Sequence, residues 1–331
     1  MSRQHPHTPS TLAIPGTALA LVLTLTSCGG GSTSATDSTG KKLEKPSLTV
    51  AGLPLTDGAP LHIAQERGLF KKEGLDVRIQ PVQQSIQALP ALAKGQVDVV
   101  SSANYVTILQ AAEKHTLEPR ILADGATVAP HMMDVLALPD SGIKDAKDLK
   151  GKKVSVNILN NIQSLTLNSI LDEQKAGRPS YRQIPFPQMG VALEKGRVDA
   201  VHASEPFATD IKEKLGARTV QDGGAPPAKG LPVSGYVSTA KFAERNPRTA
   251  AAFRRAIEKA QAIAAKDRKA VEKVLPSYAK IPPDRARAIA LPDYPTATDP
   301  ARLDKLGELM ADQGLLKKQP DTAKLLPRPA M

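Results

Sequence analysis

The chain has 331 residues, enough for two ordinary domains or one large one. Hydrophobic residues make up 41%, but aromatic residues only 3% and tryptophan is absent, so any core must be largely aliphatic. The formal charge is +11, yet lysine and arginine are interleaved with acidic residues and form no basic block with aromatic neighbours. This distribution argues against nucleic-acid binding.

The N-terminal segment 1–27 has the features of an export signal. Arg3 precedes the apolar run LAIPGTALALVLTL, which is too short and too interrupted for a membrane span. The run leads into LTSC, and Cys28 is the only cysteine, so an internal disulfide is excluded. This pattern resembles the lipobox of bacterial lipoproteins and implies lipidation at Cys28. A plain secretory signal with a free cysteine is the alternative. A Gly/Ser/Thr-rich stretch follows, and we expect 28–45 to be a flexible tether.

A ten-residue pattern occurs twice, as ALAKGQVDVV at 91–100 and as ALEKGRVDAV at 192–201. In each copy, apolar residues spaced for one helix face precede a glycine that suits the left-handed position ending a helix. A short apolar strand follows, of the kind buried on both faces of a parallel sheet. Two α/β units of the same construction predict two similar lobes. Asp98 and Asp199 are equivalent in the copies, so we expect both to be turn or helix-end caps, because one cleft needs one set of ligand contacts.

The remaining periodicity also predicts an α/β protein. The other expected elements are strands at 48–53 and 75–82, a helix that Pro60 could begin, a turn into a strand over 148–157, and helices over 164–175, 249–275 and 301–316.

Five segments carry a family resemblance: AQERGLFKKEGLDVRIQPV, ALAKGQVDVV, DLKGKKVSV, ALEKGRVDAV and EPF. Their order is similar to that in the nitrate/sulfonate/thiamine-precursor group of ABC-transporter solute-binding proteins, the aliphatic-sulfonate-binding and THI5-like family. The resemblance implies the two-lobed type II periplasmic-binding-protein fold, two α/β lobes joined by a double-crossover hinge. On this chain lobe 1 would be 46–130 plus 235–331 and lobe 2 would be 131–234, with crossings near 131–138 and 233–238.

The same resemblance implies a function. The chain would be a lipid-anchored, extracytoplasmic monomer that delivers a small organic or anionic solute to the permease and ATPase subunits of an ABC importer. We expect no cofactor, no nucleic acid and no enzymatic activity, since the THI5-type synthases depend on a Cys-rich segment that this sequence lacks. No metal is expected, and His131 and His202 are interpreted as hydrogen-bonded polar residues. A lipid-tethered sensor domain is the main alternative.

Ligands of open α/β sheets bind beyond the carboxyl ends of the strands, near helix N-termini. This rule selects four loops, 53–60, 101–105, 157–164 and 202–207, and Tyr236 lies near the second crossing. The candidate ligand-binding residues are Asp57, Gly58, Ala59, Ser102, Asn104, Tyr105, Asn160, Asn161, Ser204, Glu205, Phe207 and Tyr236.

The four loops contain no lysine or arginine, so a strong anion would have to rely on backbone amides and helix N-termini. Asp57 and Glu205 would instead suit an amine or ring N–H, and the aromatic candidates could stack on a ring or pack in the core. A sulfonate-, taurine- or nitrate-like anion and a small nitrogenous compound therefore both stay open.

Overall fold

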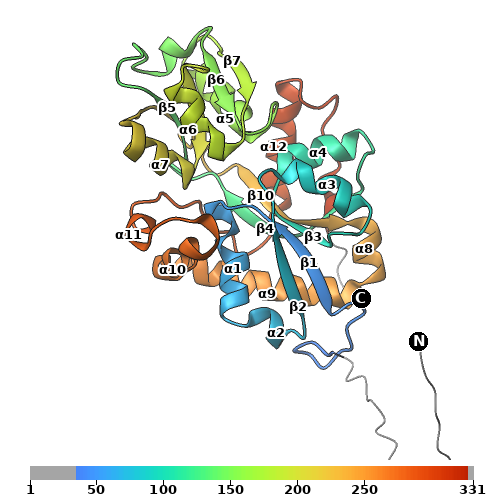
Figure 1. The fold of residues 1–331 in the computed structure, drawn as a ribbon. Helices are drawn as coiled ribbons and strands as arrows, with labels where there is room; N and C mark the ends of the chain where they lie inside the picture. The colour runs from blue at the N-terminus through green and yellow to red at the C-terminus, as the bar shows by residue number, and fades with distance from the viewer. Residues whose placement is uncertain (1–34, 327–331) are drawn as a thin grey trace, which may run out of the picture. The chain divides into compact units, whose positions relative to one another are not determined.

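The computed structural model describes residues 35–326, which contain two five-stranded sheets (Figure 1). The first sheet consists of β1 (Ser47–Gly52), β2 (Asp76–Pro81), β3 (Val99–Asn104), β4 (Pro119–Thr127) and β10 (Pro232–Thr239). The second consists of β5 (Met133–Ala137), β6 (Lys153–Val156), β7 (Ser180–Gln183), β8 (Ala200–Ser204) and β9 (Arg218–Asp222). The predicted signal peptide 1–27 and Cys28 lie outside the described residues.

The two sheets have the same construction. Their strand orders are β2-β1-β3-β10-β4 and β7-β6-β8-β5-β9. β1 pairs in parallel with β2 and β3, as β6 does with β7 and β8. β10 is antiparallel to β3 and β4, as β5 is to β8 and β9. The two-lobed α/β architecture predicted from the repeat is therefore confirmed.

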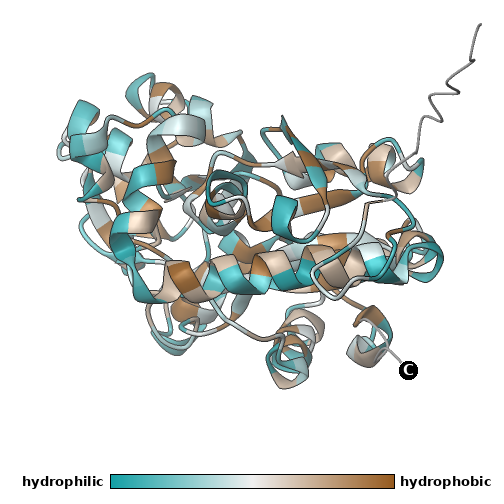
Figure 2. Ribbon diagram, turned by 90° about the horizontal axis from the view of Figure 1, so that it is seen from below, coloured by the Kyte–Doolittle hydropathy of each residue, from teal (hydrophilic) through white to brown (hydrophobic). Residues whose placement is uncertain are grey.

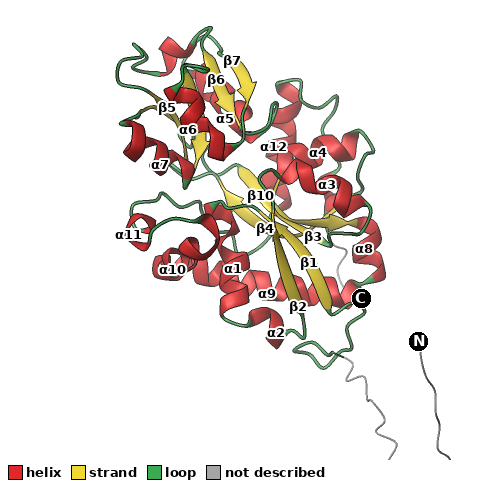
Figure 3. Cartoon of the chain, viewed as in Figure 1, coloured by secondary structure: helices red, strands yellow, loops and turns green. Residues whose placement is uncertain are grey.

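We call residues 35–127 and 232–326 lobe 1, and residues 133–222 lobe 2. The chain crosses between the two sheets at 128–132 and 223–231. The crossings expected at 131–138 and 233–238 fall largely on β5 and β10, which belong to the sheets themselves (Figure 3). The chain passes from a crossing directly into each of these two strands, and each strand pairs antiparallel with its neighbours. Local sequence patterns do not reveal this antiparallel pairing.

Helices pack on both faces of each sheet. In lobe 1, one face carries α1 (Ala59–Glu66), α2 (Leu69–Lys72), α9 (Pro247–Lys266) and α10 (Arg268–Ala279), and the other α3 (Ser85–Ala93), α4 (Tyr105–Glu113) and α12 (Pro300–Asp312). In lobe 2, α5 (Ile162–Glu173) lies on one face and α6 (Phe186–Glu194) with α7 (Phe207–Leu215) on the other. The short elements are α8 (Ala240–Arg245), α11 (Pro283–Ala286) and the 3-10 turns η1 (Thr56–Gly58), η2 (Ala146–Leu149) and η3 (Thr322–Leu325).

The helical run predicted over 249–275 is two helices. Asp267 ends α9, and its side chain accepts a hydrogen bond from the backbone N–H of Ala270 at 3.2 Å, which begins α10. Apolar and polar residues alternate along α9 (Figure 2), and the predicted stripe that includes Phe253 and Ile257 is buried. None of the described helices is long and apolar enough to cross a membrane.

The repeated segments form equivalent elements. Gly95 and Gly196 follow α3 and α6 with φ of 70° and 62°, the left-handed conformation predicted for them. Asp98 and Asp199 do not cap helix ends. The Asp98 carboxylate accepts from the backbone N–H of Thr49 at 2.9 Å, and that of Asp199 accepts from Lys153 at 2.7 Å. Each aspartate lies just before its own strand, and its hydrogen bond therefore connects that segment to the neighbouring parallel strand.

Residues 35–45, expected to belong to a tether, pack against the rest of lobe 1. Leu43 is buried in its apolar core, and Thr36 forms an isolated β-bridge with Lys42. The guanidinium group of Arg255 in α9 forms an ion pair with the Asp37 carboxylate at 2.8 Å. The pKa of Asp37 lies at about 2, because hydrogen bonds from Thr39, Lys41 and Arg255 outweigh the effect of burial.

Candidate functional site

A small cavity of about 40 Å³ is lined by both lobes. Lobe 1 contributes Leu53, Leu55, Asp57, Ser85, Ser102, Asn104, Val233 and Ser234, and lobe 2 contributes Asn157, Ile158, Asn161, Ile162, Gln163, Phe186 and Ser204. Nearly all of these residues lie where a parallel strand ends or the following helix begins, and the two from β10 lie at its start. The cavity therefore occupies the position at which open α/β sheets bind ligands.

Hydrogen bonds join the two lobes beside this cavity. The side-chain amide of Gln84 donates to the backbone carbonyl of Asn157 at 2.6 Å. Gln110 of α4 donates to the backbone carbonyl of Asn160 at 3.3 Å. Both partners on lobe 2 belong to the loop before α5, so this loop is the segment of lobe 2 that these two hydrogen bonds connect to lobe 1.

Asp57 is the one ionisable side chain in the cavity lining given above. Its two carboxylate oxygens accept from the hydroxyls of Ser102 at 2.8 Å and Ser234 at 2.6 Å. Burial raises the pKa of Asp57, although both hydroxyl bonds act in the opposite direction. Ser102 has a left-handed backbone with φ of 53°, which is uncommon for serine.

Two helices that begin at the cavity are capped by asparagine side chains. The Asn104 side-chain oxygen accepts from the backbone N–H groups of Val106 at 3.1 Å and Thr107 at 3.4 Å, at the start of α4. The Asn161 oxygen accepts from Gln163 N–H at 3.1 Å at the start of α5. These two asparagines therefore satisfy helix N-termini as well as line the cavity.

The structure brings five of the predicted site residues to the cavity, namely Asp57, Ser102, Asn104, Asn161 and Ser204. Gly58 and Ala59 are buried next to Asp57 at the start of α1 without lining the cavity. Asn160 is exposed and does not line the cavity, and its carbonyl accepts from Gln110.

The remaining four predicted residues point elsewhere. Tyr105 is buried and donates to the Asp124 carboxylate at 2.6 Å, while Tyr236 packs edge-on against Phe253 with ring centroids 5.9 Å apart. Phe207 stacks on Phe186, with centroids 5.6 Å apart. Glu205 accepts from the backbone N–H and hydroxyl of Thr209, at 3.0 and 2.8 Å. Burial raises the pKa of the Glu205 carboxyl, which does not line the cavity.

Several lining residues were not predicted. Asn157 and Gln163 lie inside the predicted loop 157–164, so the loop was located but its residues were not chosen. Ser85 begins α3, where a helix-start signal could have found it. Ser234 meets Asp57 only because β10 lies antiparallel to β3.

Two histidines differ in environment. His131 lies 3.2 Å from the Asp134 carboxylate and 4.0 Å from that of Asp222, and the three residues bring potential metal-ligand atoms together. The ammonium group of Lys212 lies 2.6 Å from the Asp134 carboxylate. The charge of this carboxylate is therefore already balanced by a side chain of the protein. His202 was expected to be hydrogen-bonded, but neither ring nitrogen has a partner within residues 35–326. Burial lowers the pKa of His202 to about 4.

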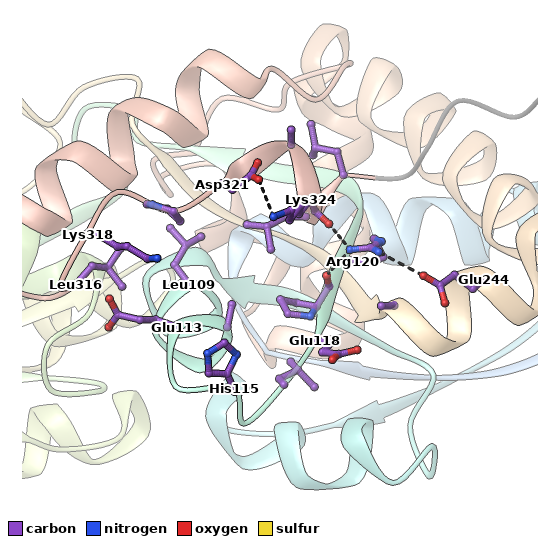
Figure 4. A pocket seen from close by; sticks show the side chains of 18 residues that line it. Leu109, Glu113, His115, Glu118, Arg120, Glu244, Leu316, Lys318, Asp321 and Lys324 are labelled. Carbon is purple, nitrogen blue, oxygen red and sulfur yellow. Dashed lines mark hydrogen bonds and ion pairs between the residues drawn. The ribbon is translucent and has the colours of Figure 1, made fainter.

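A larger hollow of about 700 Å³ lies on lobe 1, between the end of α4, the start of β4 and the segment 316–326 (Figure 4). Several of its charged side chains contact each other: Arg120 lies 3.5 Å from Glu244, and Lys324 lies 3.1 Å from Asp321. Because this hollow involves one lobe and lies away from the carboxyl ends of the parallel strands, the smaller cavity between the lobes is the better candidate for the functional site.

Comparison with known proteins identifies the family. Residues 56–270 match the family described as NMT1/THI5 like, and the chain belongs to it. It is 32% identical over 97 residues to a 4-amino-5-hydroxymethyl-2-methylpyrimidine phosphate synthase of Aspergillus parasiticus. This match covers 29% of this chain and 27% of that enzyme.

Solved structures are similar over nearly the whole fold. The alkanesulfonate-binding protein SsuA from Xanthomonas axonopodis pv. citri, bound to MOPS, matches with a TM-score of 0.72 and 18% identity, over 86% of this chain and 99% of that one. A ligand-binding component of an ABC-type import system from Staphylococcus aureus matches with a TM-score of 0.73 and 17% identity, over 85% and 96%. At these identities the likeness establishes the type II periplasmic-binding-protein fold.

Proposed function

We propose that the protein is an extracytoplasmic solute-binding lipoprotein that captures a small organic or anionic solute between its lobes and delivers it to an ABC importer. The observation that carries this proposal is the cavity between the lobes, to which polar side chains at the strand ends of both lobes contribute. Two crossing segments, 128–132 and 223–231, connect the lobes, so a hinge there would open and close the cavity.

The similar solved structures support a binding role, because one is a sulfonate-binding protein and the other a component of an import system. The similar synthase suggests catalysis as an alternative, but the match spans 97 residues and about a quarter of that enzyme. We therefore propose binding without catalysis, with sulfonate-, taurine- or nitrate-like anions and small nitrogenous compounds as the solute classes.

A solute screen with two measurements tests the proposal. A solute present at a hundred times its dissociation constant should raise the free energy of unfolding by about 2.7 kcal/mol, which thermal denaturation detects. The same solute should reduce the radius of gyration in small-angle X-ray scattering, because lobe closure makes the molecule more compact. Stabilisation without compaction would contradict capture by closure, and a chemically altered solute would favour an enzyme.

The lipid anchor needs a separate experiment. In a bacterium that processes lipoproteins, the wild-type chain should sediment with membranes and Cys28→Ser should be soluble or unprocessed, because two acyl chains give stable membrane anchoring. Equal membrane association of both proteins would contradict lipidation at Cys28. Copurification with permease subunits would support import, whereas copurification with a kinase would support a sensor.

A further inference from the structure

The charge of the cavity between the lobes restricts the solutes it can hold. Among its lining residues, Asp57 can be ionised and none is a lysine, arginine or histidine. Asp57 itself is 5% exposed, and within residues 35–326 its side chain accepts hydrogen bonds from the neutral hydroxyls of Ser102 and Ser234. A buried carboxylate without a cationic partner is unfavourable, and a bound oxyanion beside it would add like-charge repulsion. The lining alone therefore disfavours an anionic solute.

Helix N-termini could still bind an anion through their backbone N–H groups. At α4 and α5, however, the side-chain oxygens of Asn104 and Asn161 already accept from the first-turn N–H groups. At η1, which leads into α1, Asp57 itself stands in the first turn as the acidic residue. At α4 and α5 an oxygen of the protein thus already occupies the place where an oxyanion would bind. The helices α3 and α6, which begin at the lining residues Ser85 and Phe186, have no side-chain cap. The charge of Asp57 is therefore the main feature that disfavours an anion.

Asp57 has the capacity for a further partner. An ionised carboxylate has about four acceptor positions, and one serine hydroxyl occupies a position on each oxygen. The rest of the lining provides apolar surface from Leu53, Ile158 and Val233. This combination suits a compound with a nitrogen-bearing end and a small hydrocarbon part.

We propose that the cavity takes a small organic compound whose cationic or N–H-donating nitrogen pairs with Asp57, in preference to nitrate or a sulfonate. The inference rests on the proposed solute-binding function and names the solute class of that same site. A volume of about 40 Å³ limits the solute to a few non-hydrogen atoms in this arrangement of the lobes.

Titration calorimetry with matched probes tests the inference. Acetamidinium and nitrate are planar ions with the same number of non-hydrogen atoms, and propylammonium and propanesulfonate share their hydrocarbon chain. At least one nitrogen cation should bind to the purified full chain, and neither oxyanion should bind. Asp57→Asn should weaken the cation by about ten- to a hundredfold, as expected for a lost charge-assisted hydrogen bond.

Two further variants separate recognition from folding. Asp199→Asn makes the same charge change on lobe 2 away from the cavity, and we expect affinity to change by less than about twofold. Asn161→Asp preserves a good helix cap and adds a carboxylate to the lining, so it should tighten cation binding. Because position 161 is buried, the added carboxylate should lower the thermal stability of the free protein, and bound cation should restore it. Calorimetry in buffers of different ionisation enthalpy near pH 5 should detect proton release on cation binding in the wild type and none in Asp57→Asn, because burial raises the pKa of Asp57.

The outcomes distinguish this inference from the proposed function. Binding of nitrate or propanesulfonate with lobe closure, undiminished in Asp57→Asn, would overturn the inference and leave the solute-binding function intact. Cation binding that is equal in wild type, Asp57→Asn and Asn161→Asp would also overturn it. Absence of binding and of closure with every probe would overturn the inference and count against the proposed function as well.

Discussion

The two lobes share a scaffold but not a set of polar side chains. Their sheets have the same strand order and pairing, and the repeated segment leads from α3 into β3 in one lobe and from α6 into β8 in the other. Aligning the copies places Ser102 of lobe 1 opposite Ala203 of lobe 2, and Asn104 opposite Glu205. Ser102 binds Asp57 at the cavity, whereas Ala203 is buried in the apolar core of lobe 2.

This difference teaches that residues identical in the two copies maintain the sheets, and residues that differ give each lobe its own chemistry. Asp98 and Asp199 are identical and make the same bond to a neighbouring strand. Asn104 and Glu205 are equivalent, yet the first caps α4 at the cavity and the second bonds to Thr209 at the start of α7. The carboxyl that reaches the cavity, Asp57, comes from outside the repeat.

The largest expected effects concern the equivalent leucines of the repeat. Leu92 and Leu193 are 2% and 1% exposed. Leu92→Ala and Leu193→Ala should each lower the free energy of unfolding by about 2–5 kcal/mol, because each removes buried apolar contacts and leaves a cavity. Urea denaturation measures both values. A loss below 1 kcal/mol for either variant would contradict the equivalence of the two positions.

The next effect distinguishes His202 from its equivalent, Ser101. Burial lowers the pKa of His202 from 6.5 to about 4, so the unfolded chain takes up a proton within this pH range before the folded protein does. The free energy of unfolding should therefore fall as pH decreases from 6.5 to 4, by up to about 3 kcal/mol from this residue.

His202→Ser, which copies the lobe 1 residue, isolates this contribution. The variant should show a smaller decrease in stability over the same pH range than the wild type, measured by denaturant titration at several pH values. Burial raises the pKa values of Asp57 and Glu205, so the protonation of these carboxyls stabilises the folded state as pH falls and opposes the effect of His202. The test therefore compares the slopes of stability against pH for the wild type and the variant. Parallel curves for wild type and variant would exclude His202 as the titrating group.

A smaller effect separates the two repeated aspartates. Asp98 is 5% exposed, and Lys45 lies 2.5 Å from its carboxylate, whereas Asp199 is only partly buried. Asp98→Ala should cost about 1–3 kcal/mol of stability, as for a buried donor left unsatisfied, and Asp199→Ala about 0.5–1.5 kcal/mol. Thermal or urea denaturation of both variants gives the ranking. A larger loss for Asp199→Ala would reverse the comparison of the lobes.

The smallest expected effect lies between the lobes. Arg285 of lobe 1 contacts Glu213 of α7 at 2.7 Å and Asp210 at 3.3 Å, and all three side chains are about one-third exposed. Arg285→Ala should change the free energy of unfolding by less than about 1 kcal/mol, since exposed ion pairs contribute little. High salt should reduce even that difference, and a salt-independent loss would indicate packing rather than charge.

Much of the scaffold could be predicted from the sequence, because it depends on local patterns. The repeat indicated two similar lobes, the left-handed glycines Gly95 and Gly196 marked helix ends, and the rule on strand ends selected loops that reach the cavity. The positions of the crossings could not be predicted, because the antiparallel placement of β5 and β10 depends on pairing between distant segments.

The sequence by itself determined the family, the α/β class and the scarcity of basic residues around the candidate site. Only the tertiary structure decided which of two candidate carboxyls reaches the cavity. Asp57 meets Ser234 although 177 positions separate them in the chain, because β10 lies beside β3, whereas Glu205 is turned to Thr209 only four positions away. Residue type is a property of the sequence, but the direction of a side chain follows from long-range strand pairing and from the hydrogen bonds available to it.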